Sequence, residues 1–299
     1  MARGCEELDA LTTNQPLKKE IEEKFTAYEH MLGDRRFDKA TVFERFIADE
    51  KAKIDFLDNI ETQSFSLEGK HVLDAGCGKG GAAISCSLRG AASVTGFDID
   101  RVEVDIARRR AESVGITNIT FFQAAGESVQ LPTAHFDVVV AMSVLEHVKD
   151  LEQVVRNLAR AMRIGGCLCL TCPNPIYPRE AHYKIFWIPY MPKTVGRIYL
   201  KMRGLSPTFF LEHMTYPYPS FTRIEKALKS NHLDPQDVVA KAISAKLYNP
   251  ASIENTAIRR IVKLLATLKL NTILGRFVAG SHLPYPHIRI NGKKVKETK

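Results

Sequence analysis

The sequence predicts an α/β protein in which the strands of a buried, mainly parallel sheet alternate with helices. Between residues 70 and 244, short apolar runs alternate with longer amphipathic runs, which is the pattern of a doubly wound, Rossmann-like sheet. The short runs carry apolar residues on both faces, as strands between two helical layers do. The 299 residues are 45% hydrophobic and 25% charged, which supports a folded core.

The predicted elements follow in order along the chain. Residues 17–60 have apolar residues at helical spacing and predict a helical N-terminal cover. Further helices are expected at 80–89, 102–114, 150–163, 220–230 and 253–277. Strands are expected at 71–75, 92–98, 119–123, 136–142 and 167–172, then around 238–243 and near 287–290.

The alternation stops after the fifth strand. Residues 173–222 hold eight of the 14 prolines and 11 of the 25 aromatic residues, which predicts a cap inserted into the sheet domain. Such a cap can line a pocket for a bulky apolar acceptor, or it can fold around a small core of its own. The predicted division is a helical cover at 1–66, a core at 67–244 that includes a cap at 175–220, and a basic C-terminal helix with the last strand at 245–299.

Composition and charge limit the function classes. No run approaches the roughly 18 consecutive apolar residues of a membrane-spanning helix. The start of the chain is acidic and polar, unlike a secretory signal, so we expect a cytoplasmic protein. Residues 255–299 contain ten Lys and Arg and one acid, so they carry +9 while the remainder carries −1. A nucleic-acid-binding surface is therefore not expected.

The predicted C-terminal helix is basic and amphipathic. Arg259, Arg260 and Lys263 lie on its polar side, opposite a row of apolar residues. This pattern fits two arrangements: docking on the sheet with a solvated charged side, or peripheral contact with an anionic membrane.

The first predicted strand ends in a glycine-rich turn. Asp74, Gly76, Gly78 and Gly80 form the acid-x-Gly-x-Gly-x-Gly loop of methyltransferases, whereas Gly76, Gly78 and Gly81 match the dinucleotide fingerprint. A carboxylate beside the turn would repel a pyrophosphate and attract the ammonium group of a bound methionine moiety. The alternatives that remain are a nicotinamide-dependent dehydrogenase and a non-catalytic cofactor-binding module.

Two further positions suit a nucleoside. Asp98 ends the second predicted strand, where a carboxylate can accept from both ribose hydroxyls. After the third strand, the Glu127 carboxylate can accept from an adenine amino group, and the Ser128 backbone amide can donate to the adenine ring.

These positions and two later ones resemble a known family. The fourth strand leads into Leu145-Glu146-His147-Val148, and the fifth closes with Cys172-Pro173-Asn174. In order and spacing, residues 70–174 resemble the class I S-adenosylmethionine-dependent methyltransferases, in the branch with Leu-Glu-His-Val after the fourth strand. The resemblance implies a seven-stranded, mostly parallel sheet with a reversed last strand, and S-adenosyl-L-methionine as cofactor.

The resemblance also implies roles for individual residues. The glycine loop and Asp74 would hold the methionine part, Asp98 the ribose, and Ile99 one face of the adenine. Glu127 stands where many relatives have Asp. The implied cofactor-binding residues are Asp74, Gly76, Gly78, Gly80, Asp98, Ile99, Glu127, Ser128 and Met142.

Candidate catalytic residues follow the later strands. His147, with Glu146 beside it, can act as a general base toward an acceptor hydroxyl, or the pair can be structural. His182, in the cap, is a second candidate base. The expected acceptor is a small or lipid-like molecule, with O-methylation favoured and no metal required.

The spacing of Cys169 and Cys172 suggests a redox or zinc site as an alternative. Strand alternation would place these two cysteines on opposite faces of the sheet, and no second pair of ligands lies nearby. We therefore expect structural, reduced cysteines, in line with a cysteine content of six that is sparse for this length.

Overall fold

The computed structural model describes the central part of the chain and short pieces outside it. Described are residues 66–180, 183, 185–207, 217–239, 241 and 287–296, together with 16, 18–23, 57, 260, 262–264 and 267. Most of the predicted N-terminal cover and most of the helix predicted at 253–277 lie outside the described residues. Residues 18–23 are helical, as expected for the cover.

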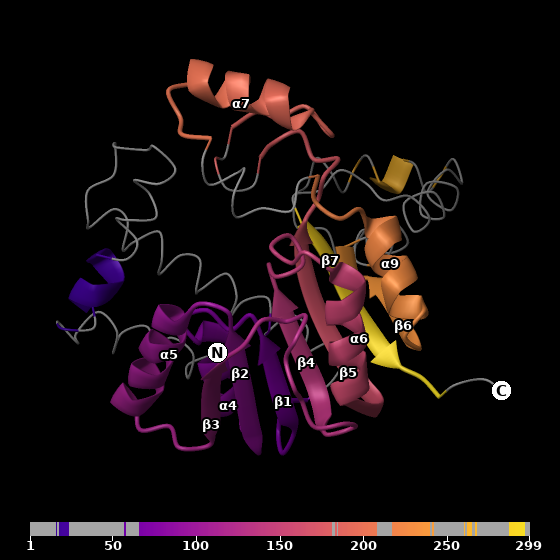
Figure 1. Cartoon of the computed structure of the whole chain (residues 1–299). Coiled ribbons are helices and arrows are strands. Elements are labelled where there is room, and N and C mark those ends of the chain that lie inside the picture. Colours follow the sequence, from indigo (N-terminus) through magenta and orange to yellow (C-terminus); the bar gives the residue numbers. More distant parts are fainter. Residues whose placement is uncertain are drawn as a thin grey trace.

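Seven strands form one sheet in the order β3-β2-β1-β4-β5-β7-β6 (Figure 1). The strands are β1 His71–Ala75, β2 Ser93–Asp98, β3 Ile119–Gln123, β4 Phe136–Met142, β5 Met162–Pro173, β6 Leu233–Asp237 and β7 His287–Lys294. Neighbouring strands are parallel except for β7, which runs antiparallel to both β5 and β6. The predicted seven-stranded sheet with a reversed last strand is confirmed.

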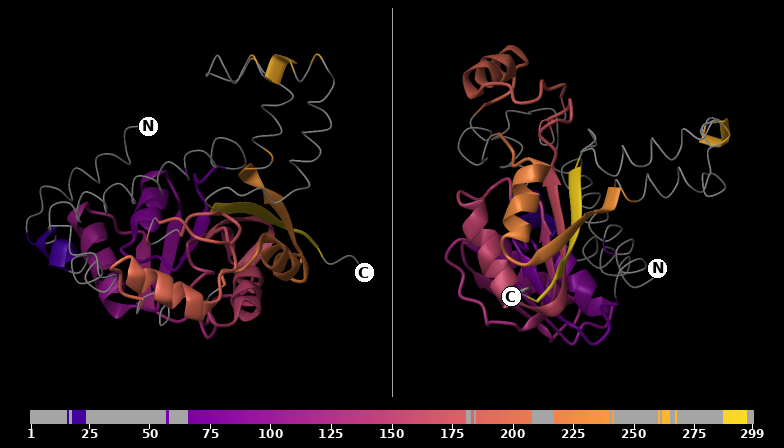
Figure 2. Two further views of the ribbon diagram at one scale, coloured as in Figure 1. Left: turned by 90° about the horizontal axis from the view of Figure 1, so that it is seen from above. Right: turned by 90° about the vertical axis from the view of Figure 1, so that its right-hand side faces the viewer.

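Helices cover both faces of the sheet (Figure 2). They are α4 Gly81–Leu88, α5 Arg101–Ser113, α6 Leu151–Ala161 and α9 Phe221–Lys229, with α7 Lys193–Met202 in the cap. One core joins α4 and α5 to strand residues such as Val72 and Val140. The other core joins α6 and α9 to Leu73 and Val139. Successive strand residues thus divide between two cores, which is why the strands are apolar on both faces.

The sixth strand differs from the prediction. It was expected at 238–243, but β6 spans Leu233–Asp237 and residues 238 and 239 are helical. As an edge strand, β6 pairs only with β7 and buries only Leu233 and Pro235. An edge strand needs one apolar face and tolerates the missing N–H of proline. The prediction that the sixth strand lies in the more apolar run at 238–243 is therefore wrong.

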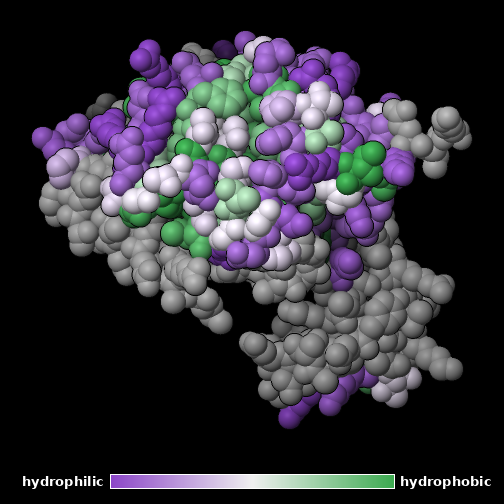
Figure 3. All heavy atoms as spheres, turned by 90° about the horizontal axis from the view of Figure 1, so that it is seen from below, coloured by the Kyte–Doolittle hydropathy of each residue, from purple (hydrophilic) through white to green (hydrophobic). Residues whose placement is uncertain are grey.

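The carboxyl ends of the parallel strands lie together at one end of the sheet, at the top of Figure 1. The chain leaves β5 at this end to enter the cap, and α7 lies above it. Figure 3 shows the opposite end from below, where the residues drawn in colour are mostly hydrophilic with hydrophobic ones dispersed among them. Doubly wound sheets bind ligands at the carboxyl ends of their strands. The cap therefore stands over the end where a site is expected.

Candidate active site

The turn after β1 brings backbone N–H groups to the carboxyl end of the sheet. Gly76, Gly78 and Gly80 have φ angles of +67°, +52° and +83°, which glycine adopts at little cost. At Gly76 space matters as well, because a Cβ there would lie 2.5 Å from Cγ2 of Val144. The glycine loop therefore packs closely against the turn that carries the Leu-Glu-His-Val segment. Asp74, near the end of β1, is buried.

Asp98 connects the end of β2 to this loop. Its carboxylate accepts hydrogen bonds from the backbone N–H of Gly78 and of Asp100, each with an N···O distance of 2.9 Å. Burial raises the pKa of Asp98, and these two hydrogen bonds oppose the rise. A carboxylate has about four acceptor positions, so Asp98 can hold the loop and still accept from two ribose hydroxyls.

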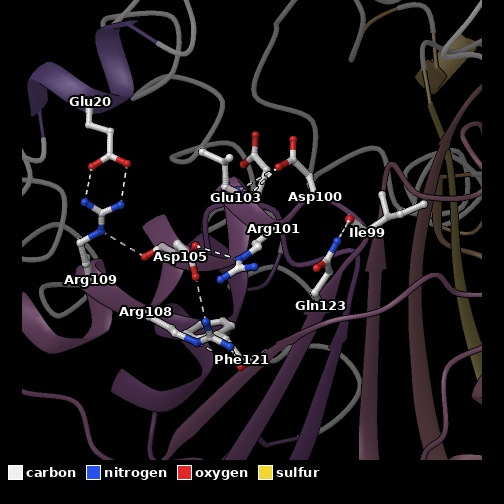
Figure 4. A network of polar contacts seen from close by, with 11 residues as sticks. Glu20, Ile99, Asp100, Arg101, Glu103, Asp105, Arg108, Arg109, Phe121 and Gln123 are labelled. Carbon is white, nitrogen blue, oxygen red and sulfur yellow. Dashed lines mark hydrogen bonds and ion pairs between the residues drawn. The ribbon is translucent and has the colours of Figure 1, made fainter.

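Ile99 follows Asp98 with its side chain 68% exposed. Its carbonyl oxygen accepts from Nε2 of Gln123 at 3.0 Å, as Figure 4 shows. On the other side, Asp100 caps α5 by accepting from the backbone N–H of Val102 at 2.8 Å. These bonds hold the backbone around Ile99, and its exposed apolar side chain suits contact with the face of a flat ring.

The loop after β3 is held in place by its own residues and by α6. Oε1 of Glu127 accepts from the backbone N–H of Lys149 at 2.8 Å, just before α6 begins. The backbone N–H of Ser128 donates to the carbonyl of Ala125 at 3.1 Å. Both groups that were expected to contact adenine thus have a bond within the protein. The Glu127 carboxylate keeps further acceptor positions, whereas the single N–H of Ser128 would have to share or exchange its bond to contact adenine.

Asn157 fixes this loop and was missed in the sequence. Its Nδ2 donates to the carbonyls of Gly126 and Glu127 at 2.9 and 3.0 Å, and the residue is buried in α6. The sequence did carry a signal for it, because Asn157 is a polar residue on the side of α6 that is otherwise apolar and includes Val154 and Leu158. A buried amide at such a position commonly serves a specific hydrogen bond.

The segment after β4 lies beside the glycine loop, since β4 and β1 are neighbours in the sheet. Met142 ends β4 and is buried, and Ser143 takes a φ of +55°, unusual for a residue with a side chain. Its N–H donates to the carbonyl of Thr171 on β5 at 3.0 Å. Glu146 is completely buried, whereas His147 is exposed. His182 lies outside the described residues.

The cap has a small core of its own. Trp187, Met191 and Leu200 are buried together, and Tyr183 and Tyr199 pack against them. These aromatic residues fit the second interpretation of the cap, in which its apolar residues stabilise a long excursion of the chain.

A buried polar pair, formed by two residues of the cap, was also missed. The Tyr218 hydroxyl donates to the Glu180 carboxylate, and both residues are buried. Burial raises the pKa of Tyr218, and the charge of Glu180 adds to the rise. The charge of Glu146, in the turn after β4, raises the pKa of Tyr218 further.

The cysteines of the described residues are free thiols. Cys169 lies in the core with α4 and α5, and Cys172 in the core with α6 and α9, so their predicted placement on opposite faces is confirmed. Burial raises the pKa of both thiols well above the ordinary value. Within the described part of the chain, no group of three or more His, Cys, Asp or Glu is placed to hold a metal ion.

Comparison with known proteins agrees with this geometry. Residues 73–170 match the methyltransferase domain family. A ubiquinone biosynthesis O-methyltransferase of Vibrio vulnificus is 31% identical over 197 residues, which are 66% of this chain and 75% of that protein. A protein of the same name from Coxiella burnetii is 35% identical over 112 residues, 38% of this chain and 47% of that protein, so this match spans about half of its length.

Among solved structures, an S-adenosylmethionine-dependent methyltransferase from Mesorhizobium loti has a TM-score of 0.51 at 18% identity, covering 79% of this chain and 96% of that one. This likeness shows the fold. Together with the family match and the Vibrio relative, it places the chain among the class I S-adenosylmethionine-dependent methyltransferases. The cofactor of that family is S-adenosyl-L-methionine, which decides against the nicotinamide alternative.

Proposed function

We propose that this protein transfers the methyl group of S-adenosyl-L-methionine to a small-molecule or lipid-like acceptor, with a hydroxyl oxygen as the favoured target. The observation that carries the proposal is the bond between the Gly78 N–H and Asp98. It fixes a glycine loop and a carboxylate at the end of the sheet that the cap covers (Figure 1). A non-catalytic cofactor-binding module would have no need of a cap over that end.

The donor set suits this cofactor. The buried Asp74 provides a negative charge for the ammonium group, and the glycine loop allows close approach to the backbone. Asp98 offers acceptor positions for the ribose, and Ile99 an apolar surface for the adenine face. The proposed binding residues are Asp74, Gly76, Gly78, Gly80, Asp98, Ile99, Glu127, Ser128 and Met142. When bound, the cofactor supplies a methyl group on a sulfonium, which is already a good leaving group.

The protein's own contribution is then orientation of the acceptor, exclusion of water and removal of a proton. Orientation of two reactants can supply a large part of the rate enhancement. For a hydroxyl acceptor, His147 is the proposed general base, because its exposed ring can reach an acceptor entering at this end of the sheet. Glu146 is buried, so we assign it the role of holding the turn that presents His147. His182 remains a second proposed base.

The names of two relatives support oxygen as the methylated atom. The names of the Vibrio and Coxiella relatives describe O-methyltransferases of ubiquinone biosynthesis. A small acceptor with a hydroxyl group and an apolar part would suit the same chemistry here.

The direct test is transfer of an isotopically labelled methyl group. The full chain is incubated with labelled S-adenosyl-L-methionine and cell extract, and the label is followed into small-molecule, lipid, protein and nucleic-acid fractions. Label in the small-molecule or lipid fraction, attached through oxygen, is the expected result. Label confined to protein or nucleic acid would overturn the proposed acceptor class.

The proposed base is tested with the acceptor found in this way. His147→Gln should lower kcat, with the largest loss at low pH, where proton removal by solvent is slowest. His135→Gln is the matched control, because His135 lies just before β4 at the opposite end of the sheet. Equal kcat values for His147→Gln and the wild type would remove His147 from the mechanism.

A further inference from the structure

The cap presents an unusual concentration of exposed apolar side chains. Val195, Ile198 and Met202 on α7 are 50%, 60% and 81% exposed. Three more exposed side chains precede the helix: Phe186, Ile188 and Tyr190. Several exposed large apolar side chains within one segment mark a candidate contact surface. We call these six residues, which all lie between positions 186 and 202, the cap patch.

The α7 residues of the cap patch form a stripe with regular spacing. They follow one another at intervals of three and four residues, so they share one side of the helix. Gly196 and Leu200 are buried on another side, where Leu200 packs with Trp187. The exposed stripe is therefore not the side that fastens α7 to the rest of the cap.

Basic residues flank this stripe. Lys193, Arg197 and Lys201 recur every four residues, and all three are exposed, as is Arg203 after the helix. The sequence has five Lys and Arg and no acidic residue between Glu180 and Glu212. An apolar stripe beside a basic row, with no compensating acid, complements a surface that is both apolar and negatively charged.

We propose that the cap patch docks on an anionic lipid bilayer, with α7 lying in the plane of the interface. The position of α7 favours this, because it stands clear of the sheet at the end where the cap lies (Figures 1 and 2). None of the described helices is long and apolar enough to cross a bilayer. Tyr190, with an apolar ring and a polar hydroxyl, suits the boundary between lipid and water.

This docking differs from the membrane contact considered for the C-terminal segment. It uses the cap, and it does not depend on which acceptor is methylated. It would bring the cofactor end of the sheet close to the lipid surface, because the cap and the glycine loop share that end.

The test is co-sedimentation of the full chain with vesicles. One set contains phosphatidylcholine alone, and the other contains equal parts phosphatidylcholine and phosphatidylglycerol. Since one basic residue near an anionic surface strengthens binding by about fivefold, wild-type protein should bind the anionic set at least about tenfold more tightly. Raising the salt concentration should weaken this binding, because the charges are screened. Absence of binding to anionic vesicles at low salt would overturn the proposal.

Paired variants show which surface is responsible. Ile198→Ser with Met202→Ser should weaken binding by about tenfold or more, because each deletes apolar area that the interface would bury. The matched control is Ile164→Ser, since Ile164 has the same exposed fraction of 60% as Ile198 but lies near the amino end of β5, away from the cap. This control should bind vesicles like the wild type. Affinity for S-adenosyl-L-methionine should be unchanged in both the double variant and the control, which would show that they fold.

Charge variants complete the test. Arg197→Glu with Lys201→Glu should abolish the preference for anionic vesicles, whereas Lys293→Glu with Lys296→Glu, at the other end of the molecule, should keep it. Two outcomes would contradict the proposal. One is binding that survives the α7 variants but is lost when Arg259, Arg260 and Lys263 are changed to Glu. The other is an α7 variant that alters only the oligomeric state, which would identify a second copy of the chain as the occupant.

Discussion

The close approach of Gly76 to Val144 predicts that a side chain at position 76 destabilises the protein. Gly76→Ala places a Cβ at φ +67° and 2.5 Å from Cγ2 of Val144. The left-handed backbone costs an L-residue about 1–2 kcal/mol. Overpacking against a close neighbour adds about 1–3 kcal/mol. The variant should therefore lose about 2–5 kcal/mol in the free energy of unfolding, and it should bind S-adenosyl-L-methionine more weakly because the loop is displaced.

Two further variants separate the two contributions. Gly115→Ala is the matched control, since Gly115 has a φ of +72° but a Cβ there meets nothing within 4 Å, so only the backbone cost of about 1–2 kcal/mol is expected. Combining Gly76→Ala with Val144→Ala removes the clash, so the two changes should couple favourably by about 1 kcal/mol or more. Urea denaturation measures the stabilities, and calorimetry measures the affinities. Two results would show that the glycine loop and the turn after β4 do not pack closely. One is a loss of unfolding free energy in Gly76→Ala that is no larger than in Gly115→Ala, and the other is no coupling between Gly76→Ala and Val144→Ala in the double-mutant cycle.

Three other predictions concern single features of the site. Asn157→Ala leaves two loop carbonyls without their side-chain donor, so we expect a loss of about 1–3 kcal/mol in unfolding free energy and weaker cofactor binding, measured by denaturation and calorimetry. Changing Cys169 and Cys172 together to Ser should lower stability, because hydroxyls replace thiols in buried positions, while the folded fraction keeps its cofactor affinity; stoichiometric zinc in the wild type, lost from this variant, would contradict that view. Burial raises the pKa of Asp98 in the folded protein, so on acidification Asp98 is protonated at a higher pH than an ordinary Asp. Cofactor affinity should therefore fall over that pH range. An affinity that does not change down to about pH 4 would argue against a contact between the cofactor and the Asp98 carboxylate.

Much of the fold could be predicted because its strands are buried on both faces. Five apolar runs become β1 to β5, since a central strand has to be apolar on both sides. The first four have almost the predicted bounds, whereas β5 begins at Met162, five residues before the predicted start. The same reasoning fails for β6. Only Leu233 and Pro235 point inward from this edge strand, so its sequence carries too little apolar signal, and Pro235 suggests a break where the edge position tolerates it.

In the site, too, features formed within a short stretch of sequence could be predicted, whereas contacts between residues far apart in sequence could not. The glycine loop could be recognised because its residues lie within one turn of the chain, and the structure places that turn directly after β1. The pair of Glu180 and Tyr218 could not be found in this way, since the two partners are 38 positions apart in the sequence. Nor could the bond that Glu127 makes, because its partner Lys149 lies 22 positions further along the chain, just before α6.

The most direct test of the proposed cofactor site is calorimetric titration of the wild type and of Asp98→Ala with S-adenosyl-L-methionine and with NAD. The wild type should bind S-adenosyl-L-methionine and not NAD at comparable concentration. Asp98→Ala should weaken binding about 5- to 150-fold, which corresponds to a loss of about 1–3 kcal/mol for buried hydrogen bonds. Asp105→Ala changes an acid on α5 that forms ion pairs with Arg101 and Arg108, and this variant should bind as the wild type does. Unchanged affinity in folded Asp98→Ala, or equal affinity for NAD, would contradict the proposed cofactor site.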